Sequence, residues 1–323
     1  LTRKIFFSVY PALLTVLTEN NYTIFSDETG VPYLIKIDNS PLTELELTIL
    51  GINVESISFN LYTRDNPTIG DVINLNDIVS VRKSHWNPHR ETIIVTHGWN
   101  SNGRSSSCTL VRDAFLNVWD SNVIIVDWGK IAKNLLYSVV AKSVPRVALR
   151  VADFVNFLQT GAGLRTSKLK IVGHSLGAHV AGLSALEIGT RSSQVAEVIA
   201  LDAAKPMFEH KGPDGRVDKS DARNVQVIHT CAGYLGLDIS VGTSDFFAND
   251  GRNQPGCVND LIGACAHSRS YEYYSESVMK SKGFLGVSQN GTTAYMGGPT
   301  LDPKAKGTYT FQTKNQYPYA PGG

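Results

Sequence analysis

Short segments rich in β-branched residues recur along the chain at intervals that leave room for helices between them. They are Ile57 to Leu61, Thr92 to Thr96, Val123 to Val126, Leu169 to Val172, Val198 to Leu201 and Val225 to Ile228. Runs such as Ile93-Ile94-Val95 are apolar at every position, which is typical of strands covered on both faces. The pattern therefore predicts a mostly parallel sheet flanked by helices.

The intervals between these segments carry helical patterns. The clearest begins at Pro145, a residue that favours the first turn of a helix, and places five apolar side chains on one face: Val147, Val151, Phe154, Val155 and Leu158. A second helix is expected from Ser175 through Leu186. In such a doubly wound α/β sheet, ligands bind at the carboxyl ends of the strands. From Ala232 the pattern loosens into long loops until a short stretch at Tyr309 to Phe311.

The chain is expected to consist of a short N-terminal segment and one domain. Residues 1–40 are a segment of open role, because Lys4 to Thr18 is basic and then apolar like part of a signal peptide, yet contains Pro11 and no clear cleavage site. A pro-segment and a short element packed on the domain are the alternatives. Residues 41–323 contain no repeat or low-complexity linker and are expected to form a single catalytic domain.

Charge and cysteine content constrain the partners and the compartment. Thirty basic and 29 acidic residues give a net charge of +1, so no overall field attracts nucleic acid or an anionic membrane. Glycosylation sequons at Asn21 and Asn290 favour a secreted, extracellular protein. Buried thiols and chance sequons in a cytosolic protein are the alternative. Four cysteines lack the spacing of a zinc site and permit two disulfides: Cys108, Cys231, Cys257 and Cys265.

The pentapeptide Gly173-His174-Ser175-Leu176-Gly177 indicates nucleophilic chemistry. A Gly-x-Ser-x-Gly string alone arises easily by chance, but here the expected strand Leu169 to Val172 enters it and an Ala-rich helical stretch leaves it. This strand-turn-helix context is what a nucleophile elbow requires. Small residues on both sides permit the tight turn that projects a serine hydroxyl, so Ser175 is the candidate nucleophile.

A serine nucleophile needs a base and a carboxylate that orients the base, and on such a fold they follow in the order Ser, Asp, His. Asp202 ends the strand Val198 to Leu201, and His267 lies in a later loop segment. We therefore predict the triad Ser175, Asp202 and His267. Spacing alone leaves competitors open: Asp127, which also ends a strand and could be a capping carboxylate, and His97, His174, His179, His210 and His229.

The oxyanion of a tetrahedral intermediate needs two backbone donors. One is expected at the amide of Leu176, directly after the nucleophile. The other is expected at Trp99, because Gly98 follows the strand Thr92 to Thr96 and lets the backbone approach a ligand closely. A turn with a buried aromatic residue is the alternative.

Taken together, these motifs resemble the animal pancreatic-lipase family. The resemblance implies an α/β-hydrolase fold and the same triad. Ala203 stands where the family commonly has Pro, and the family's C-terminal β-sandwich domain has no counterpart, so no colipase partner is expected. The matching segments occur in family order across Tyr62 to Phe311: Ile94 to Trp99, Val126 to Trp128, Val172 to His179, Leu201 to Pro206, Val227 to Thr230, Asp245 to Phe247 and His267 to Tyr271.

The resemblance also implies a short lid, because Cys257 and Cys265 match the disulfide that ties the family's lid. The loop from Cys231 through Ser244 is short as well, and both lengths are similar to those of the phospholipase A1 branch, including its insect and venom enzymes. Cys108 and Cys231 are then expected to form the second disulfide. Between the lid cysteines lie only Val258, Asn259, Asp260, Leu261, Ile262, Gly263 and Ala264.

One acidic segment is similar to a segment that holds a structural calcium ion in some family members. Its candidate ligands are the carboxylates of Asp214, Asp218 and Asp221 and the carbonyl oxygen of Arg216. An acidic solvated turn is the alternative. No cofactor is required for the expected chemistry.

The expected function is release of the sn-1 fatty acid from phospholipids at a membrane or micelle surface, through an acyl-enzyme. A long apolar lid suits a neutral triglyceride interface, whereas a shortened rim leaves room for a charged headgroup near water. The first alternative is a triacylglycerol or galactolipid lipase. The second is an inactive lipid-binding or yolk-type family member. No nucleic-acid partner is expected, and the oligomeric state is left open.

Overall fold

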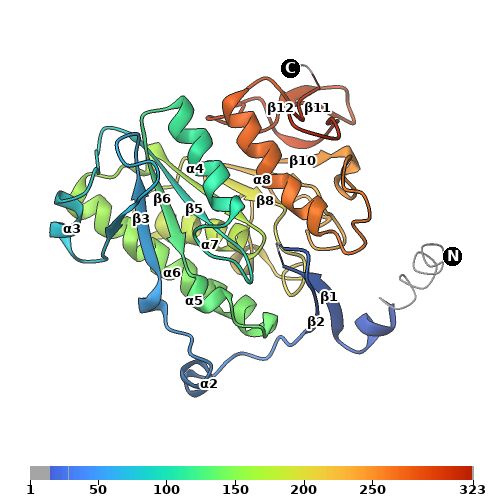
Figure 1. Cartoon of the computed structure of the whole chain (residues 1–323), viewed down its shortest axis with the longest axis horizontal. Coiled ribbons are helices and arrows are strands. Elements are labelled where there is room, and N and C mark those ends of the chain that lie inside the picture. The colour runs from blue at the N-terminus through green and yellow to red at the C-terminus, as the bar shows by residue number, and fades with distance from the viewer. Residues whose placement is uncertain (1–14, 28, 322–323) are drawn as a thin grey trace.

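The computed structural model describes residues 15–27 and 29–321, so most of the segment Lys4 to Thr18 lies outside the described residues. Its main sheet has 11 strands in the order β12-β11-β13-β10-β9-β8-β7-β5-β6-β3-β4 (Figure 1). The strands are β3 (Ser58–Tyr62), β4 (Asp71–Ile73), β5 (Glu91–Thr96), β6 (Ser121–Asp127), β7 (Leu169–His174), β8 (Glu197–Leu201), β9 (Asn224–His229), β10 (Ser244–Ala248), β11 (Leu285–Ser288), β12 (Thr293–Tyr295) and β13 (Gly307–Phe311).

The centre of this sheet is parallel and its two ends are antiparallel. Every neighbouring pair from β6 through β13 runs parallel, whereas β3 and β4 at one end and β11 and β12 at the other pair antiparallel. The prediction of a mostly parallel sheet is confirmed, and the strands expected from apolar runs lie within one or two residues of their observed ends.

Helices cover both faces of the sheet. Two long helices, α6 (Tyr137–Ala162) and α7 (Leu176–Arg191), pack on one face, and α4 (Ser106–Val118) and α8 (Ala264–Met279) pack on the other. Shorter elements are α2 (Glu44–Ile49), α3 (Ile78–Arg82), α5 (Gly129–Ala132) and 3₁₀ turns at Val54–Ser56, Thr166–Lys168, Pro213–Gly215 and Asn249–Gly251. This layered arrangement with a central parallel sheet is the α/β-hydrolase fold.

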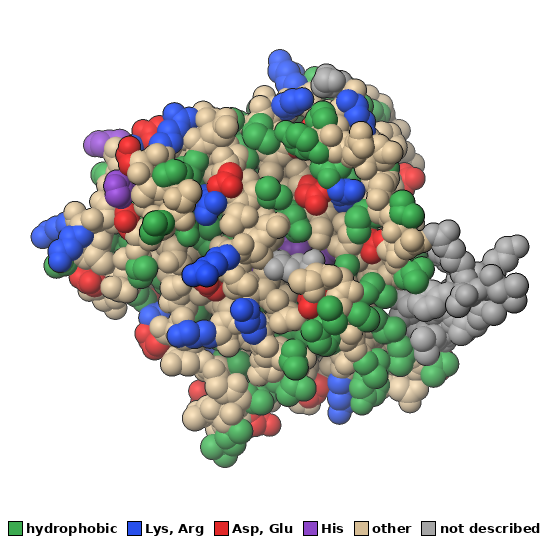
Figure 2. Space-filling model, viewed as in Figure 1, with side chains coloured by type: hydrophobic (Ala, Val, Ile, Leu, Met, Phe, Trp, Pro, Cys, Tyr) green, Lys and Arg blue, Asp and Glu red, His purple; other side chains and the backbone are tan. Residues whose placement is uncertain are grey.

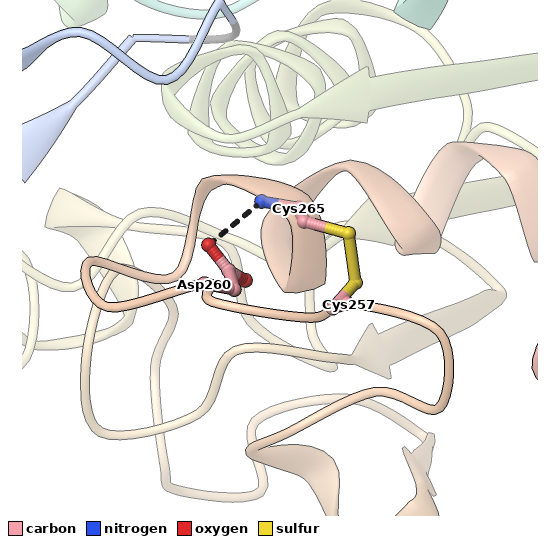
Figure 3. Close-up of side chains that lie close together, drawn as sticks. All are labelled: Cys257, Asp260 and Cys265. Atoms are coloured by element: carbon pink, nitrogen blue, oxygen red, sulfur yellow. Dashed lines mark hydrogen bonds between the residues drawn. A yellow bond between two sulfur atoms is a disulfide. The ribbon is translucent and has the colours of Figure 1, made fainter. Parts of the chain in front are cut away.

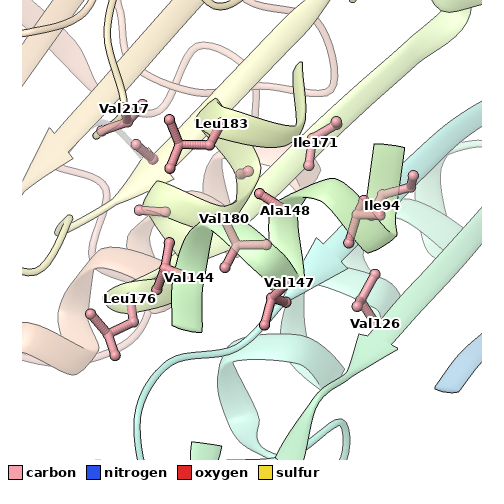
Figure 4. Packing of buried hydrophobic residues seen from close by; sticks show 14 of the residues in the cluster. Ile94, Val126, Val144, Val147, Ala148, Ile171, Leu176, Val180, Leu183 and Val217 are labelled. Atoms are coloured by element: carbon pink, nitrogen blue, oxygen red, sulfur yellow. The ribbon is translucent and has the colours of Figure 1, made fainter. Parts of the chain in front are cut away.

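Alternate strand residues enter the two cores. On β5, Ile94 faces the cluster formed with α6 and α7, while Ile93 and Val95 face the cluster formed with α4 and α8. Figure 4 shows the first cluster, in which Val147 of α6 and Val180 of α7 lie over the strands. Because both faces are covered, the central positions of β5 and β6 are apolar in sequence, which is why these strands could be found as continuous hydrophobic runs.

Two helix predictions were wrong. Pro145 was expected at a helix start but lies inside α6, which begins at Tyr137. A proline removes one helical hydrogen bond, but Val140, Ala141 and Val144 are fully buried, and this packing holds the helix through the proline. His267 was expected in a loop but lies in the first turn of α8.

Helix α8 was not predicted from the sequence because its buried face is not aliphatic. It buries Tyr271, Tyr274 and Val278, at helical spacing, together with several serines. Tyrosine and serine give a weak apolar periodicity in sequence, although their side chains fill the interior once packed.

A separate two-stranded hairpin precedes the main sheet. Strands β1 (Tyr22–Ser26) and β2 (Pro32–Lys36) pair antiparallel with each other alone among the described strands. Phe25 and Ile35 are nevertheless buried in the core cluster beneath it. Packing of the chain into the domain therefore begins before residue 41. No helix in the described part of the chain combines the length and hydropathy needed to cross a bilayer.

An ion pair inside the sheet gives a test of this arrangement. Lys170 on β7 lies opposite Glu197 on β8, with Nζ 2.6 Å from Oε2, and both side chains are buried. Lys170→Met leaves the Glu197 carboxylate buried without its cation, so we expect the free energy of unfolding to fall by about 3 to 5 kcal/mol in denaturant titration. The control Lys168→Met removes a partly exposed pair with Glu91 and is expected to cost less than about 1 kcal/mol. Equal losses in the two variants would contradict the expectation.

Candidate active site

Ser175 lies on a tight turn between strand β7 and helix α7. Its backbone has φ 58° and ψ −122°, a conformation that is strained for a residue with a side chain. The two flanking glycines make this turn possible. A Cβ on Gly173 would lie 2.0 Å from the carbonyl oxygen of Gly177, and a Cβ on Gly177 would lie 2.5 Å from the carbonyl oxygen of His97. The pentapeptide thus has the nucleophile-elbow geometry that the sequence predicted.

The structure brings Asp202 and His267 together beside this turn. Asp202 follows β8, is completely buried, and has its Oδ2 2.5 Å from Nδ1 of His267. Its other oxygen, Oδ1, accepts hydrogen bonds from the amides of Thr230 and Cys231 at 2.8 and 2.9 Å. A carboxylate against Nδ1 favours the tautomer protonated there, which leaves Nε2 able to accept a proton.

The opposite nitrogen of His267 is available for chemistry. Nε2 is buried and has no hydrogen-bond partner among the described residues. Ser175 and His267 line one small cavity with Gly98 and Trp99. A buried, unpaired imidazole nitrogen beside a serine is the arrangement that a general base for that serine requires.

The expected oxyanion donors lie on both sides of the serine. Leu176 is the first residue of α7, where backbone N–H groups have no partner within the helix. On the other side, a Cβ on Gly98 would lie 2.7 Å from Cβ of Ser175, so the loop that carries Trp99 passes directly against the nucleophile. The indole of Trp99 is buried and donates to the carbonyl oxygen of Asn134 at 2.9 Å. Both parts of the predicted site, the helix terminus and the glycine loop, therefore meet at Ser175.

Asp127 contacts the loop that carries Trp99, through His97, and makes no hydrogen bond with His267 in the described part of the chain. Its Oδ1 accepts the amide of Gly129 at 2.9 Å and lies 3.4 Å from Nε2 of His97. Burial raises the pKa of Asp127, but hydrogen bonds from His97 and Gly129 outweigh it and lower the pKa to about 2. The indole of Trp128 also donates to the carbonyl oxygen of His97. Asp127 is thus a loop-anchoring carboxylate, the alternative that the sequence left open.

The side chains of the remaining competing histidines have partners other than Asp202. Burial holds the pKa of His174 well below its ordinary value and lowers that of His179 to about 3, so both rings are neutral near pH 7. Their partners differ: the carbonyl oxygen of His267 for His174, that of Ala204 for His179, Asp245 for His229 and Glu209 for exposed His210.

The lid predicted between Cys257 and Cys265 is short and disulfide-bonded. The two sulfur atoms are joined, and Asp260 caps the start of α8 by accepting the amides of Cys265 and Ala266 at 3.1 and 2.7 Å (Figure 3). Val258 and Leu261 are exposed. A groove of about 600 Å³ lies between this lid and the turn of the N-terminal hairpin. The lid therefore forms one bank of an open groove.

The predicted disulfide between Cys108 and Cys231 is wrong. Cys108 lies on α4, in the core cluster on one face of the sheet with Phe115, whereas Cys231 belongs to the cluster on the opposite face with Leu235. The sheet separates the two side chains. The pairing was inferred from the two cysteines that remain after the lid disulfide, and the sequence does not indicate which face of the sheet each one occupies.

The acidic segment is only partly assembled for a cation. The amide of Asp218 donates to Oδ2 of Asp221 at 2.8 Å, and Oδ1 of Asp221 is buried with no hydrogen-bond partner among the described residues. Burial, with Asp218 and Asp214 nearby, raises the pKa of Asp221 to about 7. Asp214, however, is exposed, and the three carboxylates do not converge within 4.8 Å of one another. A calcium ion held by Asp214, Asp218, Asp221 and the carbonyl oxygen of Arg216 stays a prediction.

The structure adds functional candidates that the sequence analysis missed. Phe25 and Ser26 of the hairpin line the cavity at Ser175, and Gly236 packs directly on Asp202. A Cβ on Gly236 would lie 2.5 Å from Oδ1 of Asp202. A glycine in a polar loop and an aromatic residue in a short alternating strand carry no chemical signal of their own, so only the contact reveals them.

Fold and site together define an α/β hydrolase with a candidate Ser-Asp-His triad. The profile of one family, described as Lipase, matches residues 24–317. Among curated proteins, pancreatic lipase-related protein 2 of Myocastor coypus is 35% identical over 73% of this chain and 55% of its own length. The chain belongs to the pancreatic lipase family.

Two further relatives differ in what their names state. Pancreatic triacylglycerol lipase of Myocastor coypus is 32% identical over 88% of this chain and 64% of its own length. Inactive pancreatic lipase-related protein 1 of Homo sapiens is 35% identical over 74% of this chain and 55% of its own length. The chain thus spans between about half and two thirds of the length of these relatives.

Solved structures add little to this assignment. MGS-M1, an α/β-hydrolase enzyme from a deep-sea metagenome library of the Medee basin, aligns with a TM-score of 0.37 and 15% identity over 68% of this chain and 73% of its own. A likeness this weak carries no argument about the site.

The contact between Gly236 and Asp202 can be tested directly. We expect Gly236→Ala to push the Asp202 carboxylate away and to lower kcat for a soluble p-nitrophenyl ester by about tenfold or more, with KM nearly unchanged. Gly212→Ala is the matched control, since a Cβ there meets nothing within 4 Å. If Gly236→Ala keeps the kcat of the Gly212→Ala control, the position of Asp202 does not limit the reaction.

Proposed function

We propose that this protein is a secreted hydrolase of lipid esters that releases the sn-1 fatty acid of phospholipids. Ser175 attacks the ester carbonyl while Nε2 of His267 accepts its proton, and Asp202 stabilises the imidazolium that forms. The amides of Leu176 and Trp99 stabilise the oxyanion. The acyl-enzyme is then hydrolysed by a water that His267 deprotonates.

The phospholipid assignment rests on the shortness of two segments that border the site, the lid and the loop between β9 and β10. The disulfide-bonded lid is confined to the segment Cys257 to Cys265. The loop between β9 and β10 folds down onto the backbone that follows Asp202, with the amide of Lys205 donating to Leu235 and the amide of Leu237 donating to Ala203. Neither segment is a long apolar cover, which favours a substrate whose charged headgroup stays near water.

The groove beside the lid also suits an amphiphilic substrate. Its lining combines apolar side chains, such as Val258 and Leu261, with polar ones, such as Asn259 and Ser268. Ser268 directly follows the candidate base in the sequence. Figure 2 shows hydrophobic side chains gathered over the N-terminal hairpin on the same side of the molecule, where Val31 and Leu34 are exposed. These features support contact with a lipid surface.

Secretion is supported by features of the surface and by the lid. The disulfide of the lid is typical of proteins that fold in an oxidising compartment. The sequon residues Asn21 and Asn290 are both exposed, as glycan acceptors must be, and Asn290 lies in the turn between β11 and β12.

Two alternatives to a phospholipase A1 correspond to activities stated in the names of relatives. A triacylglycerol or galactolipid lipase uses the same chemistry, and pancreatic triacylglycerol lipase is among the relatives. An inactive lipid-binding or yolk-type member is the other alternative, and one of the relatives, inactive pancreatic lipase-related protein 1, is inactive by name. The paired Asp202 and His267 and the elbow at Ser175 argue for activity in this chain.

A positional assay tests the proposal. With vesicles of 1-palmitoyl-2-oleoyl-phosphatidylcholine, we expect the purified protein to release palmitate and leave the 2-oleoyl lysolipid, measured by mass spectrometry. Ser175→Ala is expected to lower this rate by at least about 10³-fold, because the acyl-enzyme cannot form.

Other outcomes of this assay select the alternatives. Rapid hydrolysis of triolein with inert phosphatidylcholine would reverse the choice in favour of a triacylglycerol lipase. No hydrolysis of either lipid, together with no labelling of Ser175 by a fluorophosphonate, would identify an inactive member.

A further inference from the structure

The N-terminal hairpin reaches the candidate catalytic site although it shares no strand pairing with the main sheet. A hairpin of two strands has little stability alone in water, so its packing against the domain holds it in place. That packing is concentrated at Phe25, whose side chain is 1% exposed. Its ring lies 5.9 Å from that of Trp99, 4.9 Å from that of Tyr137 and 6.1 Å from that of His267.

The hairpin also limits the space in front of the nucleophile. Phe25 and Ser26 line the cavity that contains Ser175 and His267. That cavity holds about 10 Å³, roughly the room that one water molecule needs. Phe25 and Ser26, at the end of β1, therefore border the space that an ester carbonyl must occupy to react with Ser175.

Asp27 connects this hairpin to the loop of the expected oxyanion donor. The side chain of Asp27 is buried, and its Oδ1 accepts the amides of Thr29 and Val31, both at 3.0 Å, which fixes the turn of the hairpin. Its Oδ2 accepts a hydrogen bond from Nδ2 of Asn100 at 2.8 Å. One carboxylate thus holds both the hairpin turn and the residue directly after Trp99.

The backbone conformation of Asn100 determines where the preceding residue, Trp99, lies. Its backbone has φ 50°, in the left-handed region that favours glycine, and its amide donates to the carbonyl oxygen of Ala132 at 2.8 Å. The peptide that carries the Trp99 amide lies just before this bend. Tyr33 of the hairpin adds a ring contact with Trp99 at 4.9 Å. The hairpin therefore contacts the Trp99 loop through Phe25, Tyr33 and the Asp27 to Asn100 bond.

We infer that the N-terminal hairpin, residues 22–36, is a wall of the active site and that Asp27 is a positioning residue for the oxyanion donor Trp99, acting through Asn100. The inference rests on the proposed function in that Ser175 is taken as the nucleophile. It gives a role to part of the N-terminal segment whose purpose the sequence left open. It also makes the geometry of the oxyanion site depend on a segment far from Ser175 in the sequence.

Reciprocal substitutions test the Asp27 to Asn100 bond. Asn100→Asp sets two carboxylates against each other, whereas Asp27→Asn alone still permits a bond if the Asn100 amide turns over and accepts through its oxygen. We expect Asn100→Asp to lower kcat for p-nitrophenyl butyrate by about tenfold or more with KM within about twofold, since misplacing an oxyanion donor acts on the transition state. The double variant Asp27→Asn with Asn100→Asp restores a donor facing an acceptor and is expected to recover kcat to within about threefold of wild type.

Two further variants separate positioning from folding. Asn100→Gly removes the link while keeping both the left-handed bend and the Asp27 turn, so it is expected to fold and still lose kcat. The control Asp38→Asn removes a different bond of the N-terminal segment, from Lys142 at 3.1 Å, and is expected to keep kcat within about twofold. Thermal unfolding of each variant checks that it is folded. A folded double variant without recovery, an unchanged kcat in Asn100→Gly, or an equal loss in Asp38→Asn would overturn the inference.

A second readout keeps this test apart from the question of substrate. The rate at which a fluorophosphonate phosphonylates Ser175 uses the same nucleophile and oxyanion site without any lipid. If wild type reacts with the probe but cleaves no phospholipid, the substrate assignment fails, and the variant series is still decided by its phosphonylation rates. If wild type cleaves phospholipid and the series is flat, the hairpin inference alone fails.

Discussion

The arrangement of this site depends on the carboxylate of Asp202. The side chain is fully buried and bonds to three backbone or ring donors, from Thr230, Cys231 and His267. A buried charge without such partners costs several kcal/mol, so the loop after β9 and the first turn of α8 are both required where they lie. Gly236 completes the enclosure because only hydrogen fits between its backbone and the carboxylate.

The same device recurs in other loops of the structure. Such loops have no ladder of regular hydrogen bonds, and aspartate side chains accept their backbone amides instead. The examples are Asp27 with Thr29 and Val31, Asp127 with Gly129, Asp202 with Thr230 and Cys231, Asp245 with Val241 and Gly242, and Asp260 with Cys265 and Ala266. In each case a carboxylate fixes the backbone of a loop or turn.

Because several aspartates anchor loops in this way, the sequence could predict only part of the site. Strands such as β5 and β6 were predictable because both faces are buried and their central positions are apolar in an unbroken run. Ser175 was predictable because a strained turn needs glycine on both sides. Asp127 and Asp202 both follow strands, and nothing local distinguishes a carboxylate that anchors a loop from one that orients a histidine. The distinction depends on which of them His267 reaches, and that contact is set by α8, whose tyrosine-rich face gave no helical pattern.

Hydrogen bonds to aspartate side chains also hold the two segments that border the site, the loop after β9 and the lid. The loop after β9 must stay close to the sheet, because Thr230, Cys231 and Gly236 all contact Asp202. This part of the loop therefore supports the triad. The lid is held short by its disulfide and by the cap that Asp260 provides. The hairpin and the lid are left as the two banks of the groove, and an amphiphile whose headgroup remains in water is the kind of substrate that such an open groove can accept.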